Sequence, residues 1–210
     1  RFFQLYRETV KSAVIYTSLG NHDVLTDNGT PYLDAFFLPQ NNPQQTRRYY
    51  SFNYGNAHFV ALDTNQSLAT ESPQMVWLRD DFANNQSVWT FVFFHHSPYS
   101  SSLHANDTNV LEVRVLLAPV MDAFKVDIVF GGHDHDYERS FPLQADLVVD
   151  SAQEPDYNDP RGTIYVITGG GGQTLYPAGT SFFTAFSQSV GHVTVVDINK
   201  TQLVLQAVTN

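Results

Sequence analysis

The chain has 210 residues, and its 21 acidic against 11 basic residues give a formal net charge of −10 at pH 7, which argues against broad electrostatic binding to nucleic acid or to an anionic membrane surface. Its 42% hydrophobic content is enough for one sizeable core, so we expect residues 1–210 to form a single domain. There is no cysteine and no apolar run of the roughly 18 to 20 residues that a membrane span needs, so thiolate metal sites are excluded and no span is expected.

Short apolar, β-branched runs recur along the chain and predict strands. These runs cover residues 13–19, 49–55, 57–64, 88–94, 126–130, 163–169, 192–198 and 202–208. Between the second and third runs, Tyr54-Gly55-Asn56 is a hairpin turn signal.

Helical patterns lie between several of these strands. The chain opens with a helix-like segment, 1–12, and further helices are predicted over 72–84 and over 109–124, where Pro119 should kink or end the second. Strand and helix alternate in the middle of the chain, and hairpins pair the remaining strands. This order predicts an α/β fold with mixed β-sheets. Residues 144–162, which contain several acidic residues, two prolines and no periodicity, are expected to be a surface loop.

Five of the eight histidines end or follow three of the predicted strands: His22, His95, His96, His133 and His135. In α/β sheets, ligands and catalytic groups gather beyond the carboxyl ends of the strands. One histidine in such a place is more often an exposed loop residue, but three such segments together favour a metal site.

His133 and His135 stand one residue apart, directly after Gly131 and Gly132. Side chains at i and i+2 of an extended chain point to one side, and glycines allow a close approach of the backbone. A polar turn is the alternative interpretation, but the His-x-His spacing favours metal ligation.

Three motifs in this order, "GNHD" (20–23), "VFFH" (92–95) and "GHDH" (132–135), resemble the last three of the five motif blocks of calcineurin-like metallophosphoesterases, and of purple acid phosphatases in particular. The continuation "HDYERS" (135–140) strengthens the narrower resemblance. It implies mixed β-sheets sandwiched by helices in an α/β/β/α four-layer fold. It also implies a dinuclear centre of Fe, Zn or Mn ions that hydrolyses phosphate esters.

The resemblance also implies a role for each matching residue. Asn21, His95 and His133 would ligate one ion and His135 the other, and imidazole and carboxamide ligands suit Fe, Zn and Mn. His22 and His104 would act on the phosphate of the substrate. Three further residues would contact these groups rather than the metals: Asp23, His96 and Arg139. His96 is ambiguous: it could face the substrate, but in an extended chain it should point away from His95. Arg139 is expected to pair with Glu138 and steady the loop of His135.

The first two motif blocks of the family, Asp-x-Gly and Gly-Asp-x-x-Tyr, are not found in the 210 residues. "RFFQLYRE" (1–8) resembles the helix that follows the second block, so we expect a catalytic domain truncated at its N-terminus, with the missing ligands on an upstream segment of the same protein. The second metal site would then be incomplete, and the chain alone could be inactive. Asp63 could replace a missing ligand, but a turn residue is the favoured interpretation.

Other features are expected to be structural. The run "TGGGGQT" (168–174) lacks a Gly-Lys-Ser/Thr ending and predicts a tight turn near the site rather than a phosphate loop. His58 and His192 lie inside strand patterns, and the aromatic pairs of 35–37 and 181–183 are predicted to be core. The loops 97–108 and 144–162 would shape the substrate pocket.

The leading functional hypothesis is hydrolysis of phosphate monoesters by attack of a metal-bound hydroxide. A phosphodiesterase or nucleotidase of the same fold is the close alternative, and a non-catalytic metal-binding or interaction domain is the rival from another class. The resemblance implies a secreted, extracellular or periplasmic protein. Five Asn-x-Ser/Thr sequons, at Asn28, Asn65, Asn85, Asn106 and Asn199, give weak support for a glycoprotein.

Overall fold

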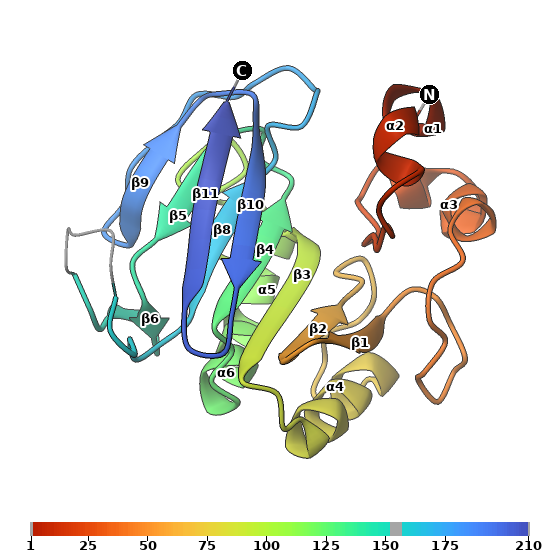
Figure 1. Ribbon diagram of the computed structural model, residues 1–210, viewed down its shortest axis with the longest axis horizontal. Coiled ribbons are helices and arrows are strands. Elements are labelled where there is room, and N and C mark those ends of the chain that lie inside the picture. The colour runs from red at the N-terminus through yellow and green to blue at the C-terminus, as the bar shows by residue number, and fades with distance from the viewer. Residues whose placement is uncertain (1, 152–156, 210) are drawn as a thin grey trace.

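The fold is described from a computed structural model that covers residues 2–151 and 157–209 (Figure 1). Its α-helices are α1 (Phe2–Leu5), α2 (Arg7–Val10), α3 (Thr30–Ala35), α4 (Pro73–Asn84), α5 (Thr108–Leu116) and α6 (Ala118–Ala123). Two short 3₁₀ helices, η1 (Asp23–Leu25) and η2 (Asp27–Gly29), precede α3. The predicted break at Pro119 is confirmed, because α5 and α6 are separate helices with the proline in the first turn of α6.

The strands form one large sheet and two small ones. They are β1 (Tyr50–Tyr54), β2 (Ala57–Ala61), β3 (Trp89–His96), β4 (Ile128–Gly132), β5 (Tyr137–Ser140), β6 (Leu143–Gln144), β7 (Leu147–Val148), β8 (Ile164–Thr168), β9 (Thr184–Gln188), β10 (His192–Ile198) and β11 (Leu203–Thr209). The large sheet has the order β1-β2-β3-β4-β8-β5-β9, and β10-β11 and β6-β7 form the two-stranded sheets.

The large sheet is mixed, as predicted. Strands β2, β3, β4 and β8 run parallel, and β1, β5 and β9 pair antiparallel with their neighbours. The turn at Gly55, which has φ +60°, joins β1 to β2 in the predicted hairpin. The parallel strands bring their carboxyl ends to one edge of the sheet, where the histidine segments leave it.

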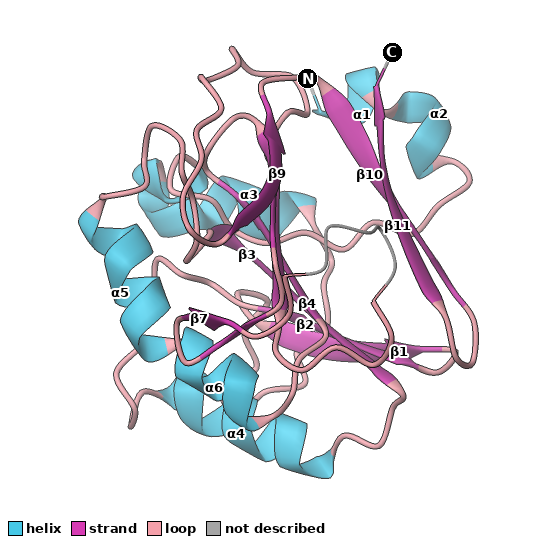
Figure 2. Ribbon diagram, turned by 90° about the vertical axis from the view of Figure 1, so that its left-hand side faces the viewer, coloured by secondary structure: helices cyan, strands magenta, loops and turns pink. Residues whose placement is uncertain are grey.

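Helices α4, α5 and α6 cover one face of the sheet, and the β10–β11 hairpin lies on the other (Figure 2). The helical side holds the largest core cluster, with Leu78, Val113 and Met121 fully buried or nearly so. On the opposite face, hairpin residues such as Val196 and Leu205 pack against a cluster from the sheet. That face is shared with α3, whose Tyr32 belongs to a third cluster. The predicted class, α/β with mixed sheets and helical layers, is confirmed.

The predicted strand 13–19 is wrong. Residues 14–20 have no assigned helix or strand and make no strand ladder. They are held beside β1 by side chains instead: the Tyr50 hydroxyl donates to the Thr17 carbonyl at 2.7 Å, and the rings of Tyr16 and Phe52 stack at 3.8 Å. An extended apolar run therefore lies along the sheet without joining its ladder.

Further elements differ from the predictions. Strands β5 and β9 and helix α3 were not predicted, and the opening helix is broken at Tyr6 into α1 and α2. The aromatic pairs are only half core, because Phe37 and Phe182 are exposed. The predicted loop 144–162 begins within the β6–β7 hairpin, and its residues 152–156 lie outside the described residues.

Candidate metal centre

The candidate site lies where three segments leave the sheet edge. Asn21 and His22 follow the extended segment 14–20, His95 and His96 end β3, and the His133 loop follows β4. The ends of β3 and β4 approach each other closely, since a Cβ added to Gly131 would lie 2.6 Å from the Cβ of Ser97. This position requires glycine.

Three side-chain atoms converge at the centre of the site. The Nε2 atom of His95 lies 2.8 Å from Oδ1 of Asn21 and 3.1 Å from Nδ1 of His133. Ligand atoms that surround one ion at about 2.0 to 2.2 Å are expected at about this mutual spacing. The donor set, two imidazoles and a carboxamide, therefore fits a single transition-metal ion.

His96 lies in the same cluster, so the expectation that it points away is wrong. Its ring centroid is 4.8 Å from that of His95 and 4.7 Å from that of His133, and ring atoms of the three imidazoles could hold a metal together. The β3–β4 register shifts between Phe93 and His96, which breaks the alternation of a regular strand. Nδ1 of His96 is paired with the Thr64 hydroxyl at 2.8 Å, and its buried Nε2 has no hydrogen-bond partner among the described residues.

Burial keeps the clustered imidazoles neutral. Desolvation, followed by charge repulsion from the neighbouring histidines, His96 first, lowers the pKa of His95 to about 3. Burial followed by His133 lowers the pKa of His96 to about 4, and burial also lowers the pKa of His133. Neutral imidazoles can offer lone pairs to a metal at neutral pH.

His135 stands apart from the three converging atoms. Its Nδ1 lies 2.8 Å from the Thr174 carbonyl, which can only accept, so this nitrogen carries the proton and Nε2 offers the lone pair. Its ring stacks on Tyr176 at 4.1 Å. Within residues 2–151 and 157–209, His135 belongs to neither group of side chains that could hold a metal.

The loop that carries His104 is fixed to the His133–His135 segment by Asp134. The buried carboxylate of Asp134 accepts from the His104 backbone N–H at 3.0 Å and from the Ser100 hydroxyl at 2.5 Å. The His104 ring lies 4.2 Å from the His133 ring. His104 is thus brought to the cluster, its contact with the substrate stays a prediction, and Asp134 is a contributor that the sequence motif did not reveal.

The glycine-rich run after β8 packs tightly behind the His133–His135 segment. Gly169 donates its N–H to the Asp136 carbonyl at 3.1 Å, and a Cβ on Gly169 would lie only 1.9 Å from the Asp134 carbonyl oxygen. The glycine at position 169 therefore allows the two backbone segments to pack closely near the site.

Asp23 folds back on its own loop. Its Oδ2 accepts from the Gly20 N–H at 2.8 Å, and so closes the turn that presents Asn21 and the exposed His22. The carboxylate thereby stabilises the turn that carries a candidate ligand.

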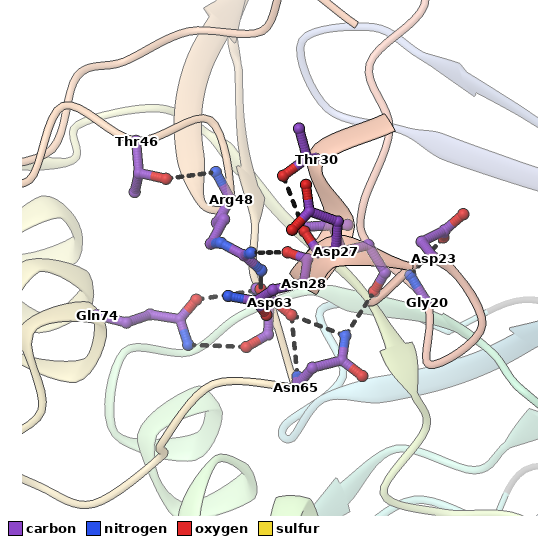
Figure 3. Close-up of polar contacts among 11 residues, drawn as sticks. Gly20, Asp23, Asp27, Asn28, Thr30, Thr46, Arg48, Asp63, Asn65 and Gln74 are labelled. Carbon is purple, nitrogen blue, oxygen red and sulfur yellow. Dashed lines mark hydrogen bonds and ion pairs between the residues drawn. The ribbon is translucent and has the colours of Figure 1, made fainter. Parts of the chain in front are cut away.

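Asp63 is a structural residue in a polar network that Asn65 connects to the start of this turn (Figure 3). Its fully buried carboxylate pairs with Arg48 at 2.9 Å and accepts from the backbone N–H and the side-chain amide of Asn65. The Asn65 amide also donates to the Leu19 carbonyl at 3.3 Å, and Arg48 donates to the Asn28 carbonyl. The favoured interpretation of Asp63 as a turn residue agrees with these contacts.

The predicted pair of Glu138 and Arg139 is wrong. Successive residues of a strand point to opposite faces, so the two side chains of β5 are separated. Glu138 is buried and accepts from the Ser101 N–H at 2.7 Å and the Thr184 hydroxyl at 2.6 Å, whereas Arg139 donates to the Tyr157 hydroxyl at 3.3 Å. It is Glu138 that steadies the loop of His104.

His58 and His192 lie outside the cluster, as expected. His192 is paired with the Thr168 hydroxyl at 3.0 Å. His58 is paired with Asp81 at 2.7 Å beside a cleft of about 800 Å³ between β1 and α4. Asp81 also accepts from Ser51 at 2.6 Å, so the buried polar groups of this cleft already satisfy one another.

Imidazoles and a carboxamide that converge at the carboxyl ends of parallel strands are the arrangement expected of a metal-dependent enzyme of the α/β type. A model of the calcineurin-like phosphoesterase family matches residues 1–137, more than half of the 210. The chain therefore belongs to the calcineurin-like phosphoesterase family.

Its relatives include acid phosphatases. Acid phosphatase type 7 of Mus musculus is 28% identical over 192 residues, which cover 82% of this chain and 43% of the relative. Purple acid phosphatase 15 of Arabidopsis thaliana is 32% identical over 163 residues, which cover 73% of this chain and 28% of the relative. The structure of purple acid phosphatase PPD1 from yellow lupin seeds has a similar fold, with a TM-score of 0.80 and 24% identity over 90% of this chain and 34% of that one. The chain spans less than half the length of these proteins.

Proposed function

We propose that this chain forms the catalytic domain, in part or whole, of an acid phosphatase-like enzyme that hydrolyses phosphate monoesters. The observation that carries the proposal is the convergence of three candidate ligand atoms, with His95 Nε2 lying 2.8 Å from Asn21 Oδ1 and 3.1 Å from His133 Nδ1. Family membership and the acid phosphatases among the relatives support the reaction class.

In this proposal Asn21, His95 and His133 hold one ion, and His135 offers its Nε2 to a second. Bound ions would polarise the phosphoryl group and activate water for its attack. Fe, Zn and Mn all suit this donor set. The second ion needs ligands beyond His135, and the relatives are long enough to supply them from outside the matched stretch.

His22 and His104 are proposed to contact the substrate. His22 is exposed on the turn that follows Asn21, and His104 lies against His133. His104 Nδ1 is paired with Asp107 at 2.8 Å, which leaves Nε2 as the nitrogen available to a phosphate oxygen or a leaving group. No covalent intermediate with the protein is required.

The proposal also includes that the protein is exported and glycosylated. Three of the sequon asparagines, Asn28, Asn106 and Asn199, are exposed and so are accessible to a glycosyltransferase. Among the described residues, none of the helices has the length and apolar character needed to cross a membrane.

The test compares hydrolysis of 4-nitrophenyl phosphate and bis(4-nitrophenyl) phosphate, with the protein in its natural length and as these 210 residues. Zn²⁺, Mn²⁺ or Fe is added, and bound metal is measured alongside the rate. His95→Ala should lose the metal, whereas His22→Ala should keep the metal and lose at least about 100-fold in rate, the range of a general acid–base group. Asp80→Asn, an exposed residue of α4, is the control.

Each outcome separates the hypotheses. Faster hydrolysis of the diester would favour a phosphodiesterase. Metal binding without hydrolysis of either substrate at natural length would favour the non-catalytic domain. A wild-type protein that binds no metal would overturn the proposed centre.

A further inference from the structure

Asp107 occupies the N-cap of α5 but does not cap it. Its backbone has the extended conformation usual for this position, with φ −65° and ψ 142°, yet its side chain makes no capping hydrogen bond. An aspartate at an N-cap normally accepts from a backbone N–H of the first helical turn. Here the carboxylate is turned away from the helix that it begins.

The carboxylate faces two histidines of the site instead. Oδ2 of Asp107 lies 2.8 Å from Nδ1 of His104 and 3.5 Å from Nε2 of His133. Nε2 of His133 is buried and makes no hydrogen bond to any described residue, so the carboxylate at 3.5 Å is the acceptor placed to receive its proton. One oxygen atom therefore lies between the imidazole of a candidate ligand and that of a candidate substrate-binding group.

These contacts favour a particular protonated nitrogen on each ring. A neutral imidazole has one N–H donor and one lone pair, and a carboxylate can only accept. If Nε2 of His133 donates to Asp107, its Nδ1 keeps the lone pair that points toward Asn21 and His95. If Nδ1 of His104 donates to the same oxygen, Nε2 of His104 is left for the substrate.

We propose that Asp107 is a positioning residue that sets the tautomer and ring orientation of both His133 and His104. The inference rests on the proposed function, in which His133 binds an ion and His104 contacts the phosphate. Asp134 holds the backbone of His104, so Asp107 is left to fix its ring. A carboxylate that orients a metal-binding histidine is a recurrent arrangement in metalloproteins, and its loss commonly weakens the metal site.

A metal ion held by His104, Asp107 and His133 is the competing interpretation, since their ligand atoms lie close enough together. It requires Nε2 of His133 to offer a lone pair while Nδ1 also faces the Asn21 and His95 ligand atoms. A neutral imidazole has only one such lone pair. The positioning role needs no additional deprotonation, and we therefore prefer it.

The test uses the 210-residue chain and does not depend on phosphatase activity. Nitrogen-15 NMR of histidine-labelled, metal-free protein reads the tautomer of each ring, and calorimetry measures the affinity for Zn²⁺. Wild type should show His133 protonated on Nε2 and His104 protonated on Nδ1. Asp107→Ala should change both tautomer populations and weaken Zn²⁺ binding by about 10- to 100-fold.

Two further variants separate positioning from loss of structure. Asp107→Glu keeps the acceptor and should restore most of the affinity, and Asp80→Asn, which removes an exposed carboxylate elsewhere, should match wild type. Unchanged tautomers and Zn²⁺ affinity in Asp107→Ala would overturn the inference. Binding that survives Asn21→Ala but disappears in Asp107→Ala and His104→Ala would also overturn it, because the ion would then lie at Asp107. If the measured tautomers and Zn²⁺ affinities agree with these expectations but the protein hydrolyses no phosphate ester, the inference is supported and only the proposed function is overturned.

Discussion

The buried Arg48–Asp63 ion pair near the Asn21 turn allows a quantitative prediction of how the free energy of unfolding responds to substitution. The Asp63 side chain is 0% exposed and that of Arg48 is 13% exposed, with 2.9 Å between Nη1 and Oδ2. Arg48→Met keeps much of the apolar stem but leaves the carboxylate buried without its counter-charge. Removing one partner of a buried pair typically costs about 3 to 5 kcal/mol, so the free energy of unfolding should fall by about that amount.

The two partners should not be equivalent. Asp63→Asn keeps an oxygen that can accept from the Asn65 N–H, and the partner left behind, Arg48, still donates to the Asn28 carbonyl. This variant should therefore cost less than Arg48→Met. The double variant should cost less than the sum of the single variants, because Arg48→Met no longer strands a charge once Asp63 is neutral.

Urea unfolding of the four proteins, with metal chelated, measures these differences. Zn²⁺ affinity supplies a second measurement, since Asn65 links Asp63 to the Leu19 carbonyl, two residues before Asn21. Arg48→Met should weaken Zn²⁺ binding as well as folding. A cost below about 1 kcal/mol for Arg48→Met, or single-variant costs that simply add, would refute the reasoning, because such a pair would behave like an exposed one.

Two further predictions concern the cluster itself. Burial, and then His133, lowers the pKa of His96 to about 4 in the folded chain, so the unfolded state takes up its proton first as pH falls below about 6.5. Stability supplied by neutral His96 is therefore complete above that pH and is lost as pH falls toward 4. Between about pH 7.5 and pH 5, the free energy of unfolding of the metal-free chain should fall by about 2 kcal/mol through this group. In His96→Gln this fall should be smaller by about the same amount, as measured by urea titrations at the two pH values. Equal losses in both proteins would contradict this account. Gly169→Ala places a Cβ 1.9 Å from the Asp134 carbonyl, a backbone atom that cannot rotate away, whereas Gly171→Ala meets nothing within 4 Å. The first substitution should cost at least about 1 to 3 kcal/mol and weaken Zn²⁺ binding, the second should do neither, and similar melting temperatures for the two variants would contradict the close packing.

The sheet and the position of the site could be predicted because both depend on local sequence patterns. Apolar runs before His95 and His133 predict buried strands, and β3 and β4 are parallel neighbours. Their carboxyl ends must then meet at one edge, which brings the two histidines together. Pro119 and Gly55 likewise act through their own backbone constraints, so their effects appear in the sequence.

Other features depend on long-range contacts that local sequence patterns do not reveal. Residues 14–20 have the composition of a strand, but side-chain contacts hold them beside β1 without a ladder. His96 joins the cluster because the β3–β4 register shifts, and the residue types at the end of the strand do not encode that shift. Asp107 reads as an ordinary N-cap. Only the folded chain brings His133, which is 26 positions further along, to its carboxylate.

The charges at the site indicate how substrate and metal binding must be coupled. Burial holds His95, His96 and His133 neutral, and the carboxylates of Asp107 and Asp134 lie against the loop of His104. A phosphate approaching this cluster meets neutral rings and negative groups, in a chain whose formal charge is already −10. Under the proposed function, the attraction for an anionic ester would come chiefly from bound cations, because they are the source of positive charge that the proposed donor set is suited to hold. In the proposed site, the burial that keeps the imidazoles neutral would suit them to bind metal and would also make substrate binding depend on that metal.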